Sequence, residues 1–214
     1  MKLTKKILLS SFAAAMAFSG ASFASAPGFY LGGNLGWGTT GAGGSDITGN
    51  LGSGVIVNSA NANGRGTAWG LNAGYQFDTN WAAELAYTRF AKTNYTAAAG
   101  TVNGVAFASG TGSYNQDVVS LVAKGLLPFE NGFSAYGKLG AAYVRFSSVN
   151  ATNNRVSATL GGSNVWRPTA GVGVKYDFNQ NVSADIGLTR IFKGGSNMPN
   201  NSDTALVGVT YNFG

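Results

Sequence analysis

The chain contains no cysteine and no histidine, and each absence removes a set of protein classes. Without cysteine there is no disulfide scaffold, even in an oxidising compartment. Without histidine, Ser-His-Asp hydrolysis, histidine-dependent acyl transfer and ordinary zinc catalysis are excluded. We therefore expect a protein with no catalytic residues, no metal site and no cofactor.

Uninterrupted hydrophobic runs are also missing beyond the first 26 residues, where Gly, Asn and charged side chains break every one. Residues 1–26 have the pattern of a secretory signal peptide: a lysine-containing start, an apolar stretch over 7–18 and a small-residue exit. The apolar stretch is shorter than the roughly 20 residues of a membrane-spanning helix. We expect cleavage after Ala24 or Ala26, which leaves 27–214 as a single barrel domain.

Positive charge is present only in modest excess. The formal net charge of +6 includes three lysines of the signal segment, and the remainder has 11 basic against eight acidic residues, a net charge of +3. That excess is too small and too dispersed for a surface that follows nucleic-acid phosphates. We expect no nucleic-acid partner.

What the sequence does have is a strict alternation between Thr67 and Phe77. The odd positions are apolar, among them Trp69 and Leu71, whereas the even positions are small or polar, among them Asn72. A period of two predicts a β-strand with two different faces. Apolar residues suit the lipid-facing wall of a membrane-spanning barrel, and small or polar residues suit its interior.

Seven further segments share this alternation, and each is close to the roughly 10 residues that a tilted strand needs to cross a bilayer. We predict an all-β fold, an eight-stranded antiparallel up-and-down transmembrane β-barrel. The predicted strands cover residues 29–37, 67–77, 81–90, 116–127, 133–146, 166–178, 182–192 and 204–213.

The connections between these segments alternate in length. Short turns are expected on the periplasmic side of such a barrel and longer loops on the outside. Both ends of the mature chain then lie in the periplasm. The three tight turns are 78–80, 128–132 and 179–181, and the four longer loops, rich in Gly, Ser, Thr and Asn, are 39–66, 91–115, 147–164 and 193–203.

Aromatic residues concentrate at the strand ends, as expected for two belts at the two water–lipid boundaries. The belt at the periplasmic edge consists of Phe29, Phe77, Trp81, Phe133, Phe178, Tyr211 and Phe213. The belt at the outer edge consists of Trp37, Trp69, Tyr87, Tyr143 and Trp166.

Strand parity places Glu84, Lys124, Lys138, Lys175 and Asp185 inside the barrel, with Lys175 almost opposite Asp185. A buried unpaired charge is costly, so these groups should pair with one another or with trapped water. They form either a structural ion-pair plug or the gate of a narrow pore. An acid–base role for the carboxylates is not favoured, since nothing suggests a substrate pocket between them.

The rims differ in charge. The periplasmic turns carry Asp78, Glu130 and Asp177 and no basic residue, whereas the outer half, which includes Arg167, is predominantly basic. Three arginines lie on the lipid-facing parity just beyond the apolar band: Arg89, Arg145 and Arg190. They either bind lipopolysaccharide phosphates, which suit the arginine fork, or snorkel to the interface.

From Gly-Phe-Tyr-Leu-Gly-Gly-Asn-Leu-Gly-Trp-Gly at 28–38 to Val-Thr-Tyr-Asn-Phe at 209–213, the chain resembles the small eight-stranded outer-membrane barrels, the OmpA-like transmembrane domain and opacity-type surface proteins. The resemblance implies location in the outer membrane of a Gram-negative bacterium and a structural, surface-display role without enzymatic activity. Adhesion is a natural use of the external loops. A narrow channel for ions or small solutes is the alternative.

The same resemblance implies three kinds of partner. Outer-membrane lipids and lipopolysaccharide surround the wall of such a barrel. The outer-membrane assembly machinery inserts it. Host surface molecules are the partners of the loops where these serve adhesion.

Overall fold

The computed structural model describes residues 27–41, 55–57, 60–97, 100–102, 105–107, 110–146, 149–153, 156–160, 164–194 and 200–214. The predicted signal peptide and both of its cleavage sites lie outside these residues. In the described part, the backbone forms sixteen strands and one short 3-10 turn, η1.

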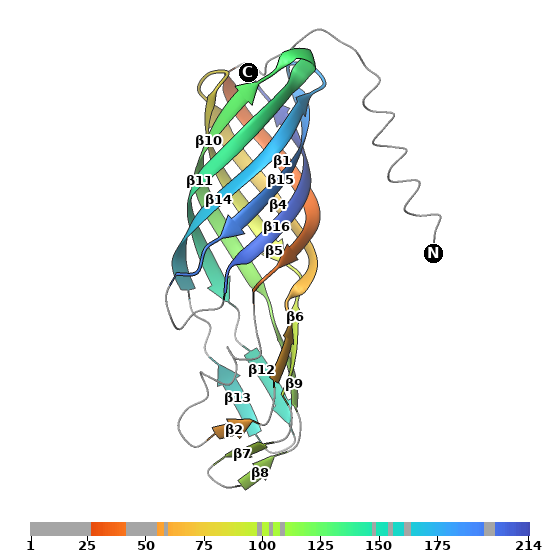
Figure 1. Ribbon diagram of the computed structural model, residues 1–214, viewed down its shortest axis with the longest axis vertical. Helices are drawn as coiled ribbons and strands as arrows, with labels where there is room; N and C mark the ends of the chain where they lie inside the picture. The colour runs from red at the N-terminus through yellow and green to blue at the C-terminus, as the bar shows by residue number, and fades with distance from the viewer. Residues whose placement is uncertain are drawn as a thin grey trace, which may run out of the picture.

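Eight of the strands close into an antiparallel barrel, with the order β1-β16-β15-β14-β11-β10-β5-β4 and with β4 paired to β1 (Figure 1). The predicted fold class is confirmed, and each predicted strand is found within two residues of its expected bounds. The barrel strands are β1 (Gly28–Thr39), β4 (Arg65–Gln76), β5 (Trp81–Phe90), β10 (Gln116–Pro128), β11 (Phe133–Phe146), β14 (Asn164–Asp177), β15 (Val182–Ile191) and β16 (Ser202–Asn212).

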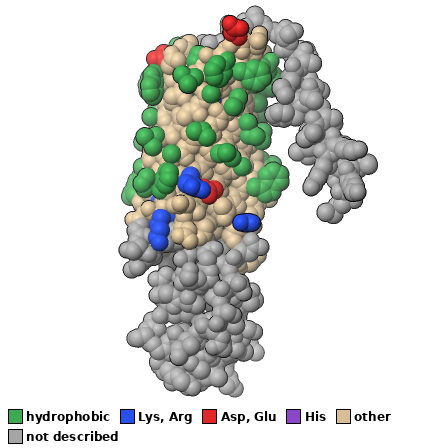
Figure 2. All heavy atoms as spheres, in the orientation of Figure 1, with side chains coloured by type: hydrophobic (Ala, Val, Ile, Leu, Met, Phe, Trp, Pro, Cys, Tyr) green, Lys and Arg blue, Asp and Glu red, His purple; other side chains and the backbone are tan. Residues whose placement is uncertain are grey.

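The barrel wall is apolar outside and mainly polar inside. On β4, Trp69 and Leu71 are 43% and 56% exposed, whereas Gln76 is buried. Figure 2 shows hydrophobic side chains spread over the outer wall, with acidic groups at one end and, toward the other, basic groups with an acidic group beside one of them. Alternation along each strand produces this arrangement, since successive side chains point to opposite faces.

Three tight connections join strands at one end of the barrel, which we call the turn end; the C-terminus lies there too (Figure 1). In the first, Asp78 accepts hydrogen bonds from the backbone N–H groups of Asn80 (2.7 Å) and Trp81 (2.8 Å). The second is η1 (Glu130–Gly132), where Asn131 has a φ of 62°. The third repeats the first, with Asn179 in the place of Asp78.

At the opposite end, called here the extension end, two more sheets lie beyond the barrel (Figure 1). Three of the four segments predicted as longer loops contain the strands of these sheets. The five-stranded sheet has the order β13-β12-β9-β6-β3, from β3 (Ala60–Asn63), β6 (Thr93–Ala97), β9 (Gly110–Tyr114), β12 (Val149–Asn153) and β13 (Val156–Leu160). The three-stranded sheet contains β2 (Val55–Val57), β7 (Gly100–Val102) and β8 (Val105–Phe107).

The five-stranded sheet extends the barrel itself. Each of its strands is joined to a barrel strand by a few residues, so β5 leads into β6 and β11 leads into β12. Pairing that continues past the rim satisfies the backbone groups of these segments, whatever their composition. Among residues with described placement, no helix has the length and apolar character needed to span a bilayer.

Candidate functional site in the barrel interior

Glu84 of β5 occupies the centre of the barrel interior and is 2% exposed. The Nζ atom of Lys138 lies 2.9 Å from one of its carboxylate oxygens, and Nζ of Lys124 lies 3.7 Å from the other. The hydroxyl of Tyr30 donates a hydrogen bond of 3.1 Å, and the amide of Asn72 donates one of 3.4 Å. One carboxylate therefore ties together side chains from five strands.

The rings of Tyr30 and Tyr136 lie beside the lysines that pair with Glu84. Nζ of Lys124 lies 4.3 Å from the ring centroid of Tyr136, and Nζ of Lys138 lies 5.2 Å from it. The ring faces carry negative potential, so they stabilise the two cations that share Glu84. Tyr136 packs directly on Gly173 of β14, where any side chain would meet its ring.

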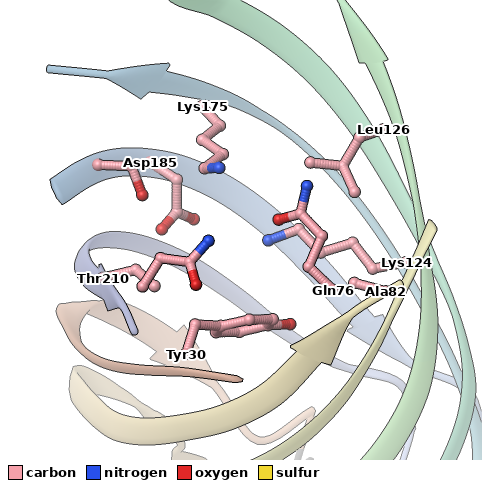
Figure 3. Close-up of a pocket in the computed structure, with 10 residues that line it drawn as sticks. Tyr30, Gln76, Ala82, Lys124, Leu126, Lys175, Asp185 and Thr210 are labelled. Carbon is pink, nitrogen blue, oxygen red and sulfur yellow. The ribbon is translucent and has the colours of Figure 1, made fainter. Parts of the chain in front are cut away.

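Asp185 joins the cluster through Tyr136, whose hydroxyl donates to it at 2.7 Å. Lys175 and Asp185 are register partners, as parity predicts, and Figure 3 shows both beside the cavity that Tyr30 also lines. Lys175 also forms an ion pair with Asp177, at 2.8 Å. Asp177 is buried, so its assignment to the turn surface was wrong: its side chain points inward one step before the turn.

With Asp177 included, the ion-paired part of the interior contains three lysines (Lys124, Lys138 and Lys175) and three carboxylates (Glu84, Asp177 and Asp185). The buried Arg167 adds a fourth positive charge toward the extension end. Two small cavities flank the central layer: one of about 20 Å³ near Lys175 and one of about 50 Å³ beside Lys138. At about 10–15 Å³ per water, the smaller cavity has room for one or two waters and the larger one for three to five.

The extension end of the interior contains an apolar cluster among buried polar side chains, which the sequence reasoning missed. Phe90, Val118, Ala142, Val144 and Ile191 form a buried cluster there, on the inward parity. These residues could have been found from the sequence, because they place large apolar side chains on a face that is otherwise small or polar.

Arg167, predicted as part of the basic outer half, is the register partner of Ala142 in this cluster and is 1% exposed, so its charge lies in the interior and does not contribute to a basic rim. Its Nε and Nη2 atoms donate to the carbonyl oxygens of Phe192 (2.6 Å) and Asn200 (3.0 Å). The alternation of β14 places Arg167 on the inward face, but it does not show how far below the rim the side chain lies. A buried guanidinium thus joins the segment after β15 to β14.

The three outward arginines differ in their partners. Arg190 forms two hydrogen bonds to Asp203, at 2.6 and 3.0 Å. Arg89 lies 3.7 Å from Asp117, which also accepts a hydrogen bond of 2.8 Å from Tyr87. Arg145 is exposed and is the register neighbour of Asp117 on the other side.

The aromatic side chains predicted to form two belts lie on the outward face, and several stack in pairs. At the turn end, the ring centroids of Phe29 and Tyr75 are 4.9 Å apart, and those of Tyr211 and Phe213 are also 4.9 Å apart. Toward the extension end, Tyr143 and Trp166 are separated by 5.1 Å. The remaining members of the belts, Trp37, Trp69, Phe77, Trp81, Tyr87, Phe133 and Phe178, are outward on their strands.

Comparison with protein families gives one match over nearly the whole chain: residues 8–213 fit the family described as "Outer membrane protein beta-barrel domain". An uncharacterized protein of Coxiella burnetii is 26% identical over 215 aligned positions, which cover 88% of this chain and 86% of that protein.

Solved structures show the same fold at low identity. Neisserial surface protein A is 17% identical, with a TM-score of 0.57, covering 91% of this chain and 99% of that one. OprG of Pseudomonas aeruginosa is 16% identical, also with a TM-score of 0.57, covering 90% and 99%. The N-terminal barrel of OprF from the same organism is 16% identical, with a TM-score of 0.50, covering 87% and 98%.

Proposed function

The chain belongs to the family of outer membrane protein β-barrel domains, and from this premise we propose that it is a non-enzymatic scaffold that displays a β-sheet extension at the bacterial cell surface. One observation carries the proposal: five barrel strands (β4, β5, β10, β11 and β14) are each joined, within a few residues, to a strand of the five-stranded sheet. A scaffold that continues into its display element fixes that element in position. The bacterial outer membrane is the location that the family implies.

The filled interior supports a structural role for the barrel. The ion pairs around Glu84 and the apolar cluster around Phe90 lie one above the other along the barrel axis. An eight-stranded barrel has an interior that side chains just fill. The partners proposed are outer-membrane lipids and lipopolysaccharide around the wall, the assembly machinery during insertion, and host surface molecules at the extension.

The absence of cysteine allows a direct test of display, because the cysteine introduced in a single-cysteine variant is the one thiol of the chain that can be labelled. Asn94→Cys lies on an exposed position of β6 in the extension, and Gln180→Cys lies in an exposed tight turn. A membrane-impermeant maleimide should label the first variant on intact cells and the second only after lysis. Labelling of Gln180→Cys on intact cells, or no labelling of Asn94→Cys, would refute the proposed orientation.

The alternative function is a narrow channel for ions or small solutes. The two cavities that flank the Glu84 layer favour it, because ion pairs that exchange partners could join them. Planar-bilayer recordings separate the two functions. A scaffold gives no reproducible conductance, whereas a channel gives steps whose size changes in Glu84→Gln or Lys138→Met. Conductance with that dependence would replace the scaffold proposal.

A further inference from the structure

A groove of about 790 Å³ runs over the outer wall where β1, β16, β15 and β14 approach the extension end. Strand register arranges its outward lining in two adjacent rows. The apolar row contains Trp37, Ala205, Leu188 and Val172, paired in that order across the four strands. The polar row lies two residues further along each strand, toward the extension end. It contains Arg65, Thr39, Asp203 and Arg190.

The hollow exists because the middle of the apolar row is an alanine. Ala205 lies between Trp37, which is 70% exposed, and Leu188. On the neighbouring strands β4 and β5 large side chains cover the wall instead: the ring centroids of Trp69 and Tyr87 are 5.8 Å apart. A void on a lipid-facing wall forfeits dispersion contacts unless something fills it.

The polar row presents positive charge directly above this hollow. Among the described residues that line the groove, the charged ones are Arg65, Arg190 and Asp203, so the lining has an excess of one positive charge. Asp203 occupies two of the five N–H donors of Arg190, which leaves donors for a second acceptor. The arginine fork matches the oxygens of a phosphate group.

We propose that this groove binds the lipid A part of lipopolysaccharide, with one acyl chain along the apolar row and a phosphate held by Arg190 and Arg65. Lipid A suits the two rows because its phosphates and acyl chains are attached to the same sugars and leave them close together. The proposal goes beyond surface display, and it narrows the lipopolysaccharide contact predicted for three arginines to Arg190.

The chain provides a matched control for each half of the site. Arg89 is an outward arginine paired with an aspartate, as Arg190 is, but it stands above the filled wall at Tyr87. Ala141 is an exposed outward alanine, as Ala205 is, but it lies outside the groove. We therefore compare Arg190→Gln with Arg89→Gln, and Ala205→Leu with Ala141→Leu.

The measurement is the dissociation constant for rough lipopolysaccharide, titrated into each folded variant in nonionic detergent. Arg190→Gln should weaken binding about tenfold through loss of a charge-assisted phosphate contact. Ala205→Leu should also weaken it about tenfold, because it fills the chain site. Both control variants should bind within about twofold of wild type, a difference below 0.5 kcal/mol.

Three outcomes would overturn the proposal. The first is equal weakening by Arg190→Gln and Arg89→Gln, which would reduce the site to general rim charge. The second is unchanged binding in Ala205→Leu, verified as folded by its heat-modifiable migration. The third is phosphatidylglycerol binding as tightly as lipopolysaccharide with the same variant pattern, which would make the occupant a phospholipid. If Ala205→Leu does not fold, the two arginine variants and the phospholipid comparison decide the question.

Discussion

The ammonium group of Lys138 lies 2.9 Å from a carboxylate oxygen of Glu84, although their strands, β11 and β5, are separated by β10. The strand between them contributes Lys124, whose ammonium group lies 3.7 Å from the other oxygen. One carboxylate is therefore shared by two cations from adjacent strands. This makes the three members of the cluster unequal, since loss of the carboxylate leaves two buried cations while loss of one cation leaves a pair.

That inequality predicts different costs for Glu84→Gln and Lys124→Met. Glu84→Gln should lower the free energy of unfolding by about 3–5 kcal/mol, because it leaves uncompensated buried charge. Lys124→Met should cost less, since Glu84 keeps its contact with Lys138. Urea unfolding in phospholipid vesicles, followed by tryptophan fluorescence, measures both. Equal costs, or a Glu84→Gln cost as small as that of the turn variant Glu130→Gln, would contradict the central role of Glu84.

The contact between Tyr136 and Gly173 predicts a second difference. A Cβ atom at Gly173 would overlap both the Tyr136 ring and the backbone oxygen of Ile186, whereas one at Gly137 has no atom within 4 Å. Gly173→Ala should cost about 1–3 kcal/mol of unfolding free energy through overpacking. Gly137→Ala should be neutral or stabilise by about 0.4–1 kcal/mol through the unfolded chain. The same vesicle assay applies, and a reversed order would show that the ring has room to move.

The apolar cluster at the extension end predicts that interior packing matters there more than the lipid-facing wall. Phe90 is 3% exposed on the inward face of β5, and Leu85 is 53% exposed on the outward face of the same strand. Phe90→Ala should cost about 3–5 kcal/mol because it leaves a cavity. Leu85→Ala should cost about 1–2 kcal/mol, since lipid fills the space. Similar midpoints in urea for the two variants would argue against a packed cluster at Phe90.

The barrel was predictable from the sequence because one signal was repeated eight times. Alternation over about 10 residues places the same face outward in each strand, and a shift by one residue would reverse it. The tight turns followed from the same segments. Parity also assigned Glu84, Lys124 and Lys138 to the interior, where the structure finds them.

The alternation of a strand shows which face a side chain is on, but not how far below the rim it lies or which side chains it contacts. Asp177 and Arg167 lie near strand ends, where an inward residue can be at the rim or below it; both are buried. The contact from Tyr136 to Asp185 joins β11 to β15, two strands apart, and depends on the stagger of the barrel. The strands of the five-stranded sheet have another cause: segments such as β3 (Ala60–Asn63) and β9 (Gly110–Tyr114) are rich in Ala, Asn or Gly, which have low strand propensity, and they form strands by continuing the strand order of the barrel.

The first tight turn allows a test of whether the hydrogen bonds or the charge of Asp78 stabilise it. The carboxylate of Asp78 accepts two backbone N–H groups, those of Asn80 and Trp81. In the third turn, Asn179 accepts the equivalent pair at 2.9 and 2.8 Å without a charge. Asp78→Ala should therefore lower the free energy of unfolding by about 1–3 kcal/mol, because two hydrogen bonds are lost. Asp78→Asn should remain within about 0.5 kcal/mol of wild type, since an amide oxygen makes the same bonds. Vesicle unfolding of both variants distinguishes geometry from charge: an Asp78→Asn cost equal to that of Asp78→Ala would mean that the negative charge, and not the two hydrogen bonds, stabilises this turn.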